Sequence, residues 1–215
     1  GGFAVEVDGE EVPTSAWGSR RARQLCKRLV AARGWPVTRD ELIDLLWPDE
    51  FDMRKLGARL SVQLSAVRRV LRGGVIADRD TVRLDLDEVA TDLEMFHKAT
   101  DDAAVVAAYT GEFLPEDQYE DWTAATRDEA RARFVLAARR VAEQELAAGR
   151  HGRAAELGYR LIESDRYDEG AHRLVVTALV AAGERAEAER AHQTWVTALA
   201  ELDVDAPPLA EVVDS

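Results

Sequence analysis

The 215-residue sequence contains a single cysteine, Cys26, and no long apolar run. One cysteine excludes an internal disulfide and any zinc site built from cysteine ligands, and the apolar pattern around Cys26 predicts a small, reduced core residue. No stretch of about 18 apolar residues could span a bilayer, and no basic-then-apolar leader opens the chain. We therefore expect a cytoplasmic protein without a membrane partner. The start at Gly1-Gly2, without Met, is typical of a piece of a longer protein.

Sequence motifs of catalysis and of cofactor binding are also missing. The four histidines show no close metal-ligand spacing, and we expect the three in the C-terminal half, His151, His172 and His192, at the surface. There is no Walker or dinucleotide-binding glycine loop and no G-x-S-x-G nucleophile motif, and Gly73-Gly74 is typical of a turn. The sequence predicts no catalytic residue, metal or cofactor, and a protein that is not an enzyme.

The charge is divided unevenly along the chain. The formal net charge is −13, of which residues 1–98 carry −1 and residues 99–215 carry −12. Within the first part, residues 53–77 contain no Asp or Glu. Since the field of a protein acts locally, the total charge does not exclude a nucleic-acid partner for this segment.

The first half shows the element order of a winged helix. Residues 3–12 alternate apolar and polar side chains around Asp8-Gly9, which predicts a hairpin. Three amphipathic helices follow, beginning after the N-cap Ser19, after a Thr38/Glu41 capping box, and at about Asp52. Residues 75–84 then predict a second hairpin. We predict an α+β winged helix-turn-helix domain over residues 1–90.

The second half indicates an all-α, tetratricopeptide-like helical repeat domain over residues 91–215. It is rich in Ala, Glu, Arg and Leu, and a long helix is predicted over about residues 119–148. Residues 146–150 recur as residues 180–184, an offset of 34 residues that is the tetratricopeptide period. Pro207-Pro208 is expected to end the last helix. Such repeats bind polypeptides, and the alternative is a passive spacer.

The third predicted helix has two distinct faces. At about 100° per residue, one narrow stripe collects its large apolar residues, which are Leu56, Leu60, Leu64, Val67 and Leu71. The opposite face collects basic and small residues, which are Arg54, Lys55, Ala58, Arg59, Ser61, Val62, Ser65, Arg69 and Arg72.

This second face fits the major groove of DNA, which admits one helix and offers phosphates, base edges and thymine methyl groups. We assign Arg54, Lys55 and Arg59 to base edges or adjacent phosphates. Deeper in the groove we place Ser61, Val62 and Ser65, and at phosphates Arg69 and Arg72. The alternative is an ordinary solvated face, but such a face usually mixes both signs of charge to form ion pairs one helical turn apart, and this segment has no acid.

The second hairpin carries Arg79, Thr81 and Arg83 at its tip and second strand. These residues suit a wing that reaches phosphate or the minor groove. Asp78 and Asp80 flank Arg79 and would repel DNA, so the alternative is an ordinary exposed hairpin.

These motifs resemble the actinobacterial antibiotic regulatory protein family, which joins a response-regulator-type winged helix to a bacterial transcriptional activation domain. In the first half the resemblance rests on three runs, residues 20–24, 37–48 and 60–71. In the second half it rests on residues 92–96, 109–115, 120–122, 168–172 and 191–199.

The resemblance implies a function that the residues alone do not give. It implies that the third helix is the recognition helix and the second hairpin the wing, and that the protein binds promoter direct repeats. It also implies that the loop between helices two and three, with Asp49, Glu50, Phe51 and Asp52, contacts RNA polymerase. We therefore expect a sequence-specific double-stranded DNA-binding activator that recruits RNA polymerase.

The near-neutral first domain predicts weak intrinsic DNA affinity, because non-specific binding depends on the number of phosphates neutralised. Occupancy would then need a homodimer, adjacent sites or polymerase contact. The alternative function is a protein-interaction module of a larger signalling protein, in which the winged helix no longer binds DNA.

Overall fold

The computed structural model describes residues 1–213, which form two compact units. The first comprises Gly1–Lys98 and Thr110–Arg127, and the second comprises Ala99–Tyr109 and the chain from Asp128 onward. The domain boundary between residues 90 and 91 stays a prediction.

The first unit opens with the predicted hairpin. Strands β1 (Glu6–Val7) and β2 (Glu10–Glu11) pair antiparallel, with Glu6 opposite Glu11. Asp8 and Gly9 form the turn with φ of 56° and 82°, the left-handed conformation that a two-residue hairpin loop requires and that Asp and Gly tolerate. A short 3-10 helix, η1 (Thr14–Trp17), leads into the helices.

Three helices follow, and each begins at a side-chain cap. Ser19, Thr38 and Asp52 accept hydrogen bonds from backbone N–H groups at the starts of α1 (Arg20–Ala31), α2 (Arg39–Leu46) and α3 (Met53–Val70), as helix N-termini require. The capping box is only half formed, because the Glu41 carboxylate binds Arg28 on α1. The Glu41 carboxylate therefore binds a side chain of another helix and not the backbone N–H of Thr38.

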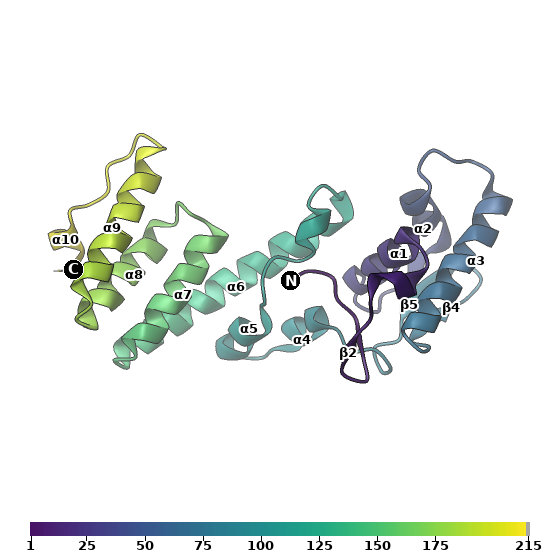
Figure 1. The fold of residues 1–215 in the computed structure, drawn as a ribbon, viewed down its shortest axis with the longest axis horizontal. Coiled ribbons are helices and arrows are strands. Elements are labelled where there is room, and N and C mark those ends of the chain that lie inside the picture. Colours follow the sequence, from purple (N-terminus) through teal and green to yellow (C-terminus); the bar gives the residue numbers. More distant parts are fainter. Residues whose placement is uncertain (214–215) are drawn as a thin grey trace. The chain divides into compact units, whose positions relative to one another are not determined.

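A three-stranded antiparallel sheet completes the winged helix, in the order β3-β5-β4. Its strand β4 lies beside α3 (Figure 1). The predicted hairpin is β4 (Val75–Ala77) with β5 (Thr81–Leu84), and Ile76 lies opposite Arg83. β3 (Val37–Thr38) was not predicted, because two residues are too few to show an alternating pattern. It pairs with β5 and places the start of α2 beside the wing.

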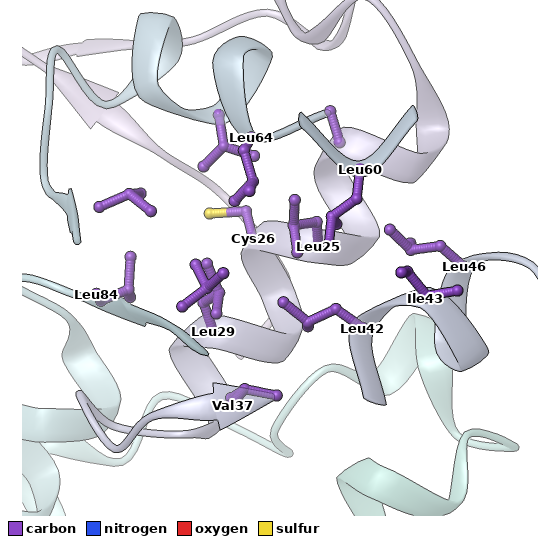
Figure 2. Packing of buried hydrophobic residues seen from close by; sticks show 14 of the residues in the cluster. Leu25, Cys26, Leu29, Val37, Leu42, Ile43, Leu46, Leu60, Leu64 and Leu84 are labelled. Atoms are coloured by element: carbon purple, nitrogen blue, oxygen red, sulfur yellow. The ribbon is translucent and has the colours of Figure 1, made fainter. Parts of the chain in front are cut away.

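The apolar stripe of α3 forms the centre of the first core. Leu56, Leu60, Leu64 and Val67 are each at most 2% exposed, and Leu60 and Leu64 face Leu25 and Cys26 of α1 in Figure 2. At the end of the stripe the helix stops at Val70, so that Val70 is buried and Leu71 only partly so. The buried stripe therefore turns the opposite face of α3 away from the core.

The rest of the first unit packs beside these elements. It contains α4 (Asp92–Lys98) and the 3-10 helix η2 (Pro115–Asp117). Leu93 of α4 forms a small apolar cluster with Phe113 and Leu114, and Phe3 and Trp122 pack against it.

The second unit is helical. Its elements are α5 (Asp102–Ala108), most of α6 (Asp121–Ala147), α7 (His151–Ser164), α8 (Glu169–Ala181), α9 (Arg185–Ala200) and α10 (Leu209–Val213), and α7, α8 and α9 lie side by side in Figure 1. Together with the first unit, this confirms the predicted fold class of a winged helix followed by a tetratricopeptide-like helical region.

The 34-residue offset appears in the backbone geometry. Gly149 and Gly183 have φ of 74° and 83°, and Arg150 and Glu184 after them share φ −88° and ψ 60°. Both turns make the same hydrogen bonds, because residues 149 and 183 each donate to the carbonyl three positions back, and residues 150 and 184 to the carbonyl five positions back. The repeated sequence therefore forms the same turn twice.

Two expectations for the second unit are wrong. α9 ends at Ala200, well before Pro207-Pro208, which instead precede α10. His172 is buried and stacks on Trp195 with ring centroids 5.9 Å apart, while its Nε2 lies 2.9 Å from the carbonyl of Arg166. An acidic composition predicted a surface imidazole, but this position faces the core of the repeat.

The buried thiol gives a test of the first core. Burial raises the pKa of Cys26 to about 12 by disfavouring its thiolate, and the thiolate is the reactive form. We expect no measurable reaction of the native protein with a disulfide reagent at pH 8, and one equivalent released in denaturing urea. Rapid reaction of the folded protein would show that the α1–α3 core opens.

Candidate nucleic-acid interface

The outward face of α3 is open to solvent within the first unit. Exposed side chains follow one another along it, namely Arg54, Lys55, Ala58, Ser61, Val62, Ser65, Arg68 and Arg69. Val62 is 65% exposed in the middle of this helix. We call this set, together with Arg59, the outward face.

The hydroxyl groups of the outward face bond within the helix. Ser61 Oγ donates to the carbonyl of Gly57 and Ser65 Oγ to that of Ser61, each at 2.9 Å. Their oxygen lone pairs remain available as acceptors. With Ala58 and Val62 beside them, these short side chains leave the middle of the face low, with longer basic side chains at its ends.

Several of the predicted DNA-binding cations are already paired with carboxylates. Lys55 Nζ lies 3.2 Å from Asp52, Arg59 binds Glu50, and Arg72 Nη1 lies 2.5 Å from Asp8. All three carboxylates lie outside the acid-free segment, so the sequence pattern did not reveal them. Exposed pairs of this kind contribute about 1 kcal/mol or less, so a phosphate could replace each carboxylate at small cost.

Arg72 does not lie on the helix. α3 ends at Val70, and Arg72 has φ of 52° in the turn that follows. The helical projection that grouped Arg72 with Arg69 therefore does not apply. Arg68 supports the wing, because its Nε donates to the carbonyl of Val75 at 3.3 Å.

Asp78 builds the tip of the wing. Its carboxylate accepts hydrogen bonds from the N–H groups of Asp80 and Thr81 and from the Thr81 hydroxyl, at 2.7 to 2.9 Å. These bonds lower the pKa of Asp78. Arg39 joins the tip to α2, since its backbone N–H donates to the carbonyl of Asp80 and its Nε to that of Asp78. The acid next to Arg79 is thus a structural part of the turn.

The predicted wing residues occupy different environments. Arg79 is 94% exposed at the tip, Thr81 is half-buried and bonded to Asp78, and Arg83 is half-buried on β5. Arg83 lines a depression of about 450 Å³ together with Arg33 and Trp35. Trp35 is 75% exposed, and the sequence analysis missed it because a single aromatic outside a periodic segment gives no signal.

The loop between α2 and α3 lies beside the outward face. Asp49, Glu50, Phe51 and Asp52 are all exposed, and Phe51 is 88% exposed. Asp52 caps α3 by accepting from the Lys55 N–H at 3.2 Å. The four residues therefore divide into two that bond to α3, Glu50 and Asp52, and two that project from the loop, Asp49 and Phe51.

The part of the chain that the structure describes has neither a metal-ligand cluster nor a membrane-spanning helix. Within residues 1–213, no group of three or more His, Cys, Asp and Glu side chains is placed to hold a metal ion. No helix in that part of the chain has both the length and the apolar character to cross a bilayer.

Comparison with known proteins gives a match to a family model and matches to solved structures. A family model described as "bacterial transcriptional activator domain" matches residues 83–212. No curated protein matches. Among solved structures, the chain is similar to Mycobacterium tuberculosis EmbR, solved in complex with a low-affinity phosphopeptide, with a TM-score of 0.69 and 23% identity. The match covers 100% of this chain and 62% of the EmbR chain, and at this identity it shows the fold alone.

A substitution of Asp78 in the wing has two opposite expected effects on DNA binding, one through the charge and one through the shape of the turn. Asp78→Ala removes a negative charge from the wing, which would strengthen binding to any polyanion, but it also removes three hydrogen bonds that shape the turn. If the wing contacts DNA, we expect Asp78→Ala to weaken duplex binding several-fold, as measured by fluorescence anisotropy.

The matched control is Asp80→Ala. It removes the same charge two residues along the chain, and the Asp80 side chain is 83% exposed. We expect Asp80→Ala to bind at least as tightly as the wild type. Tighter binding by both variants would show that only charge, and not the shape of the turn, matters at the wing.

Proposed function

Because the chain belongs to the family of regulators with a bacterial transcriptional activator domain, of the antibiotic regulatory protein type, we propose that it is a DNA-binding transcriptional activator. In this proposal α3 enters the major groove of promoter direct repeats and the hairpin β4-β5 contacts the flanking backbone. The α2–α3 loop contacts RNA polymerase, and the protein acts in the cytoplasm. The observation that carries the proposal is the exposed outward face of α3, opposite its buried leucine stripe.

The chemistry of the outward face fits a duplex better than a generic solvated surface. Val62 is an exposed apolar side chain between two serines, which suits contact with a thymine methyl group and neighbouring polar base edges. Arg54 and Lys55 lie near the N-terminus of the helix, the end that contacts base edges in helix-turn-helix proteins. Arg69 is the penultimate residue of α3, where it can reach phosphate.

The uneven charge of the chain supports different binding partners for its two halves. Residues 99–215 carry −12 and would be repelled by DNA, while stacked helix pairs offer surfaces that bind polypeptide. We therefore assign DNA to the winged helix and protein partners, RNA polymerase among them, to the α2–α3 loop and the helical unit. The almost neutral residues 1–98 predict modest affinity at a single site, so that two copies on adjacent repeats, free or as a homodimer, would raise occupancy.

A salt titration tests this proposal. The protein is titrated onto a 30-base-pair duplex of random sequence between 50 and 200 mM salt. Each neutralised phosphate contributes a slope of about −0.9 to log K against log salt. We expect a steep fall for the wild type, and a slope smaller by about 1 for Arg69→Ala with the circular dichroism unchanged.

Arg185→Ala, an exposed arginine at the start of α9, is the control and should leave the slope unchanged. Selection of tight binders from a random duplex pool then gives the operator. If the wild type shows no salt-dependent binding to the random duplex and also selects no sequence from the pool, the alternative function is favoured, a docking module whose winged helix does not bind DNA.

A further inference from the structure

The Arg59 side chain lies between two surfaces that the proposed function keeps apart. It belongs to the outward face of α3, yet its Nη1 donates to the carboxylate of Glu50 in the α2–α3 loop. The Arg59 and Glu50 side chains are 42% and 48% exposed, so water and ligands reach both. A residue assigned to DNA and a residue assigned to polymerase are thus bonded to each other.

The ring beneath Arg59 is fixed in place. Trp47 is 3% exposed, and the guanidinium of Arg59 lies 4.8 Å from its ring centroid. A second guanidinium, that of Arg21 on α1, lies 5.7 Å from the same ring and donates to the carbonyl of Leu46 at 3.0 Å. The end of α2 is therefore anchored by buried contacts. The backbone N–H of Glu50 donates to the carbonyl of Trp47 at 3.2 Å, whereas its carboxylate is held by an exposed ion pair. The Glu50 side chain is therefore the part of this cluster that can move.

We propose that Glu50 occupies the phosphate site of Arg59 in the free protein, so that DNA binding and the position of the α2–α3 loop are coupled. When the duplex binds, a backbone phosphate replaces the Glu50 carboxylate at Arg59, and Glu50 becomes free to bind a partner protein together with Phe51. Trp47 keeps the guanidinium over its ring during the exchange and so positions Arg59 for phosphate. This inference rests on the proposed DNA-binding function.

The strength of the Arg59–Glu50 ion pair determines how strongly DNA binding and the α2–α3 loop are coupled. An exposed ion pair is weak enough for a phosphate to displace, and it therefore lowers DNA affinity by about 1.5-fold to fivefold. Because coupling between two sites is reciprocal, a partner that takes Glu50 raises DNA affinity by the same factor. Polymerase and DNA would then each favour binding of the other through one arginine.

The test compares two substitutions with the same change of charge in the same loop. Glu50→Gln removes the competitor of phosphate, and Asp49→Asn removes one negative charge without altering a side-chain contact of Arg59. With a 30-base-pair duplex at 100 mM salt, we expect Glu50→Gln to bind about 1.5-fold to fivefold more tightly than Asp49→Asn. In an Arg59→Ala background, the difference between the two substitutions should disappear.

Amide hydrogen exchange of residues 49–52 provides a second measurement. We expect duplex DNA to accelerate exchange in this loop of the wild type, and to leave it unchanged in Glu50→Gln, whose loop is already released. Equal affinities of Glu50→Gln and Asp49→Asn would overturn the inference and leave the proposed function standing. Weaker binding by Glu50→Gln would also overturn it, since Glu50 would then hold Arg59 in its binding position. A wild type that does not bind duplex DNA would overturn both.

Discussion

The burial of one stripe of α3 determines what the first unit can present to a ligand. Leu56, Leu60, Leu64 and Val67 are buried in the first core and fix the rotation of α3 about its axis. A buried leucine contributes about 1.5–3 kcal/mol, while each exposed ion pair of Lys55 or Arg59 contributes about 1 kcal/mol or less. The apolar stripe therefore determines the orientation of α3, and the positions of the basic residues on the opposite face follow from it.

A second constraint is a pair of buried cations, Lys27 and Arg127, whose partners lie in residues 110–127. This segment belongs to the first unit although the matched family segment contains it. Lys27 of α1 is 7% exposed, and its Nζ lies 3.0 Å from Glu116 and 2.5 Å from Asp117. Arg127 donates to the carbonyls of four residues, Phe113, Leu114, Asp117 and Gln118. A buried cation without such partners would be strongly destabilising. These contacts make the segment an integral part of the first unit and explain why the compact units interleave along the chain.

The features that the sequence predicted and the contacts that it missed differ in how far apart the interacting residues lie along the chain. Helices, caps and turns depend on residues one to four positions apart, so the caps Ser19 and Thr38 and the turn Asp8-Gly9 could be predicted from neighbouring residues alone. The repeat could be predicted because two short segments of the sequence resemble each other. Partners that lie far apart could not. The binding of Arg28 by Glu41, of Arg72 by Asp8 and of Arg59 by Glu50 depends on how the helices pack, and so does the burial of His172 against Trp195.

The same difference explains the candidate interface. Composition gave an acid-free segment and suggested unpaired cations. The N-cap Asp52 instead pairs with Lys55 in the first turn of α3, and packing brings Glu50 to Arg59 and Asp8 to Arg72. Such a surface attracts phosphate less strongly at a distance than bare cations would, because carboxylates screen its field. On contact each carboxylate can be exchanged for a phosphate, so that binding depends on a close geometric fit more than on long-range attraction. A winged helix with nearly balanced charge would on this argument bind random DNA weakly, and would depend on base contacts from the middle of α3 and on partner proteins to remain at its site.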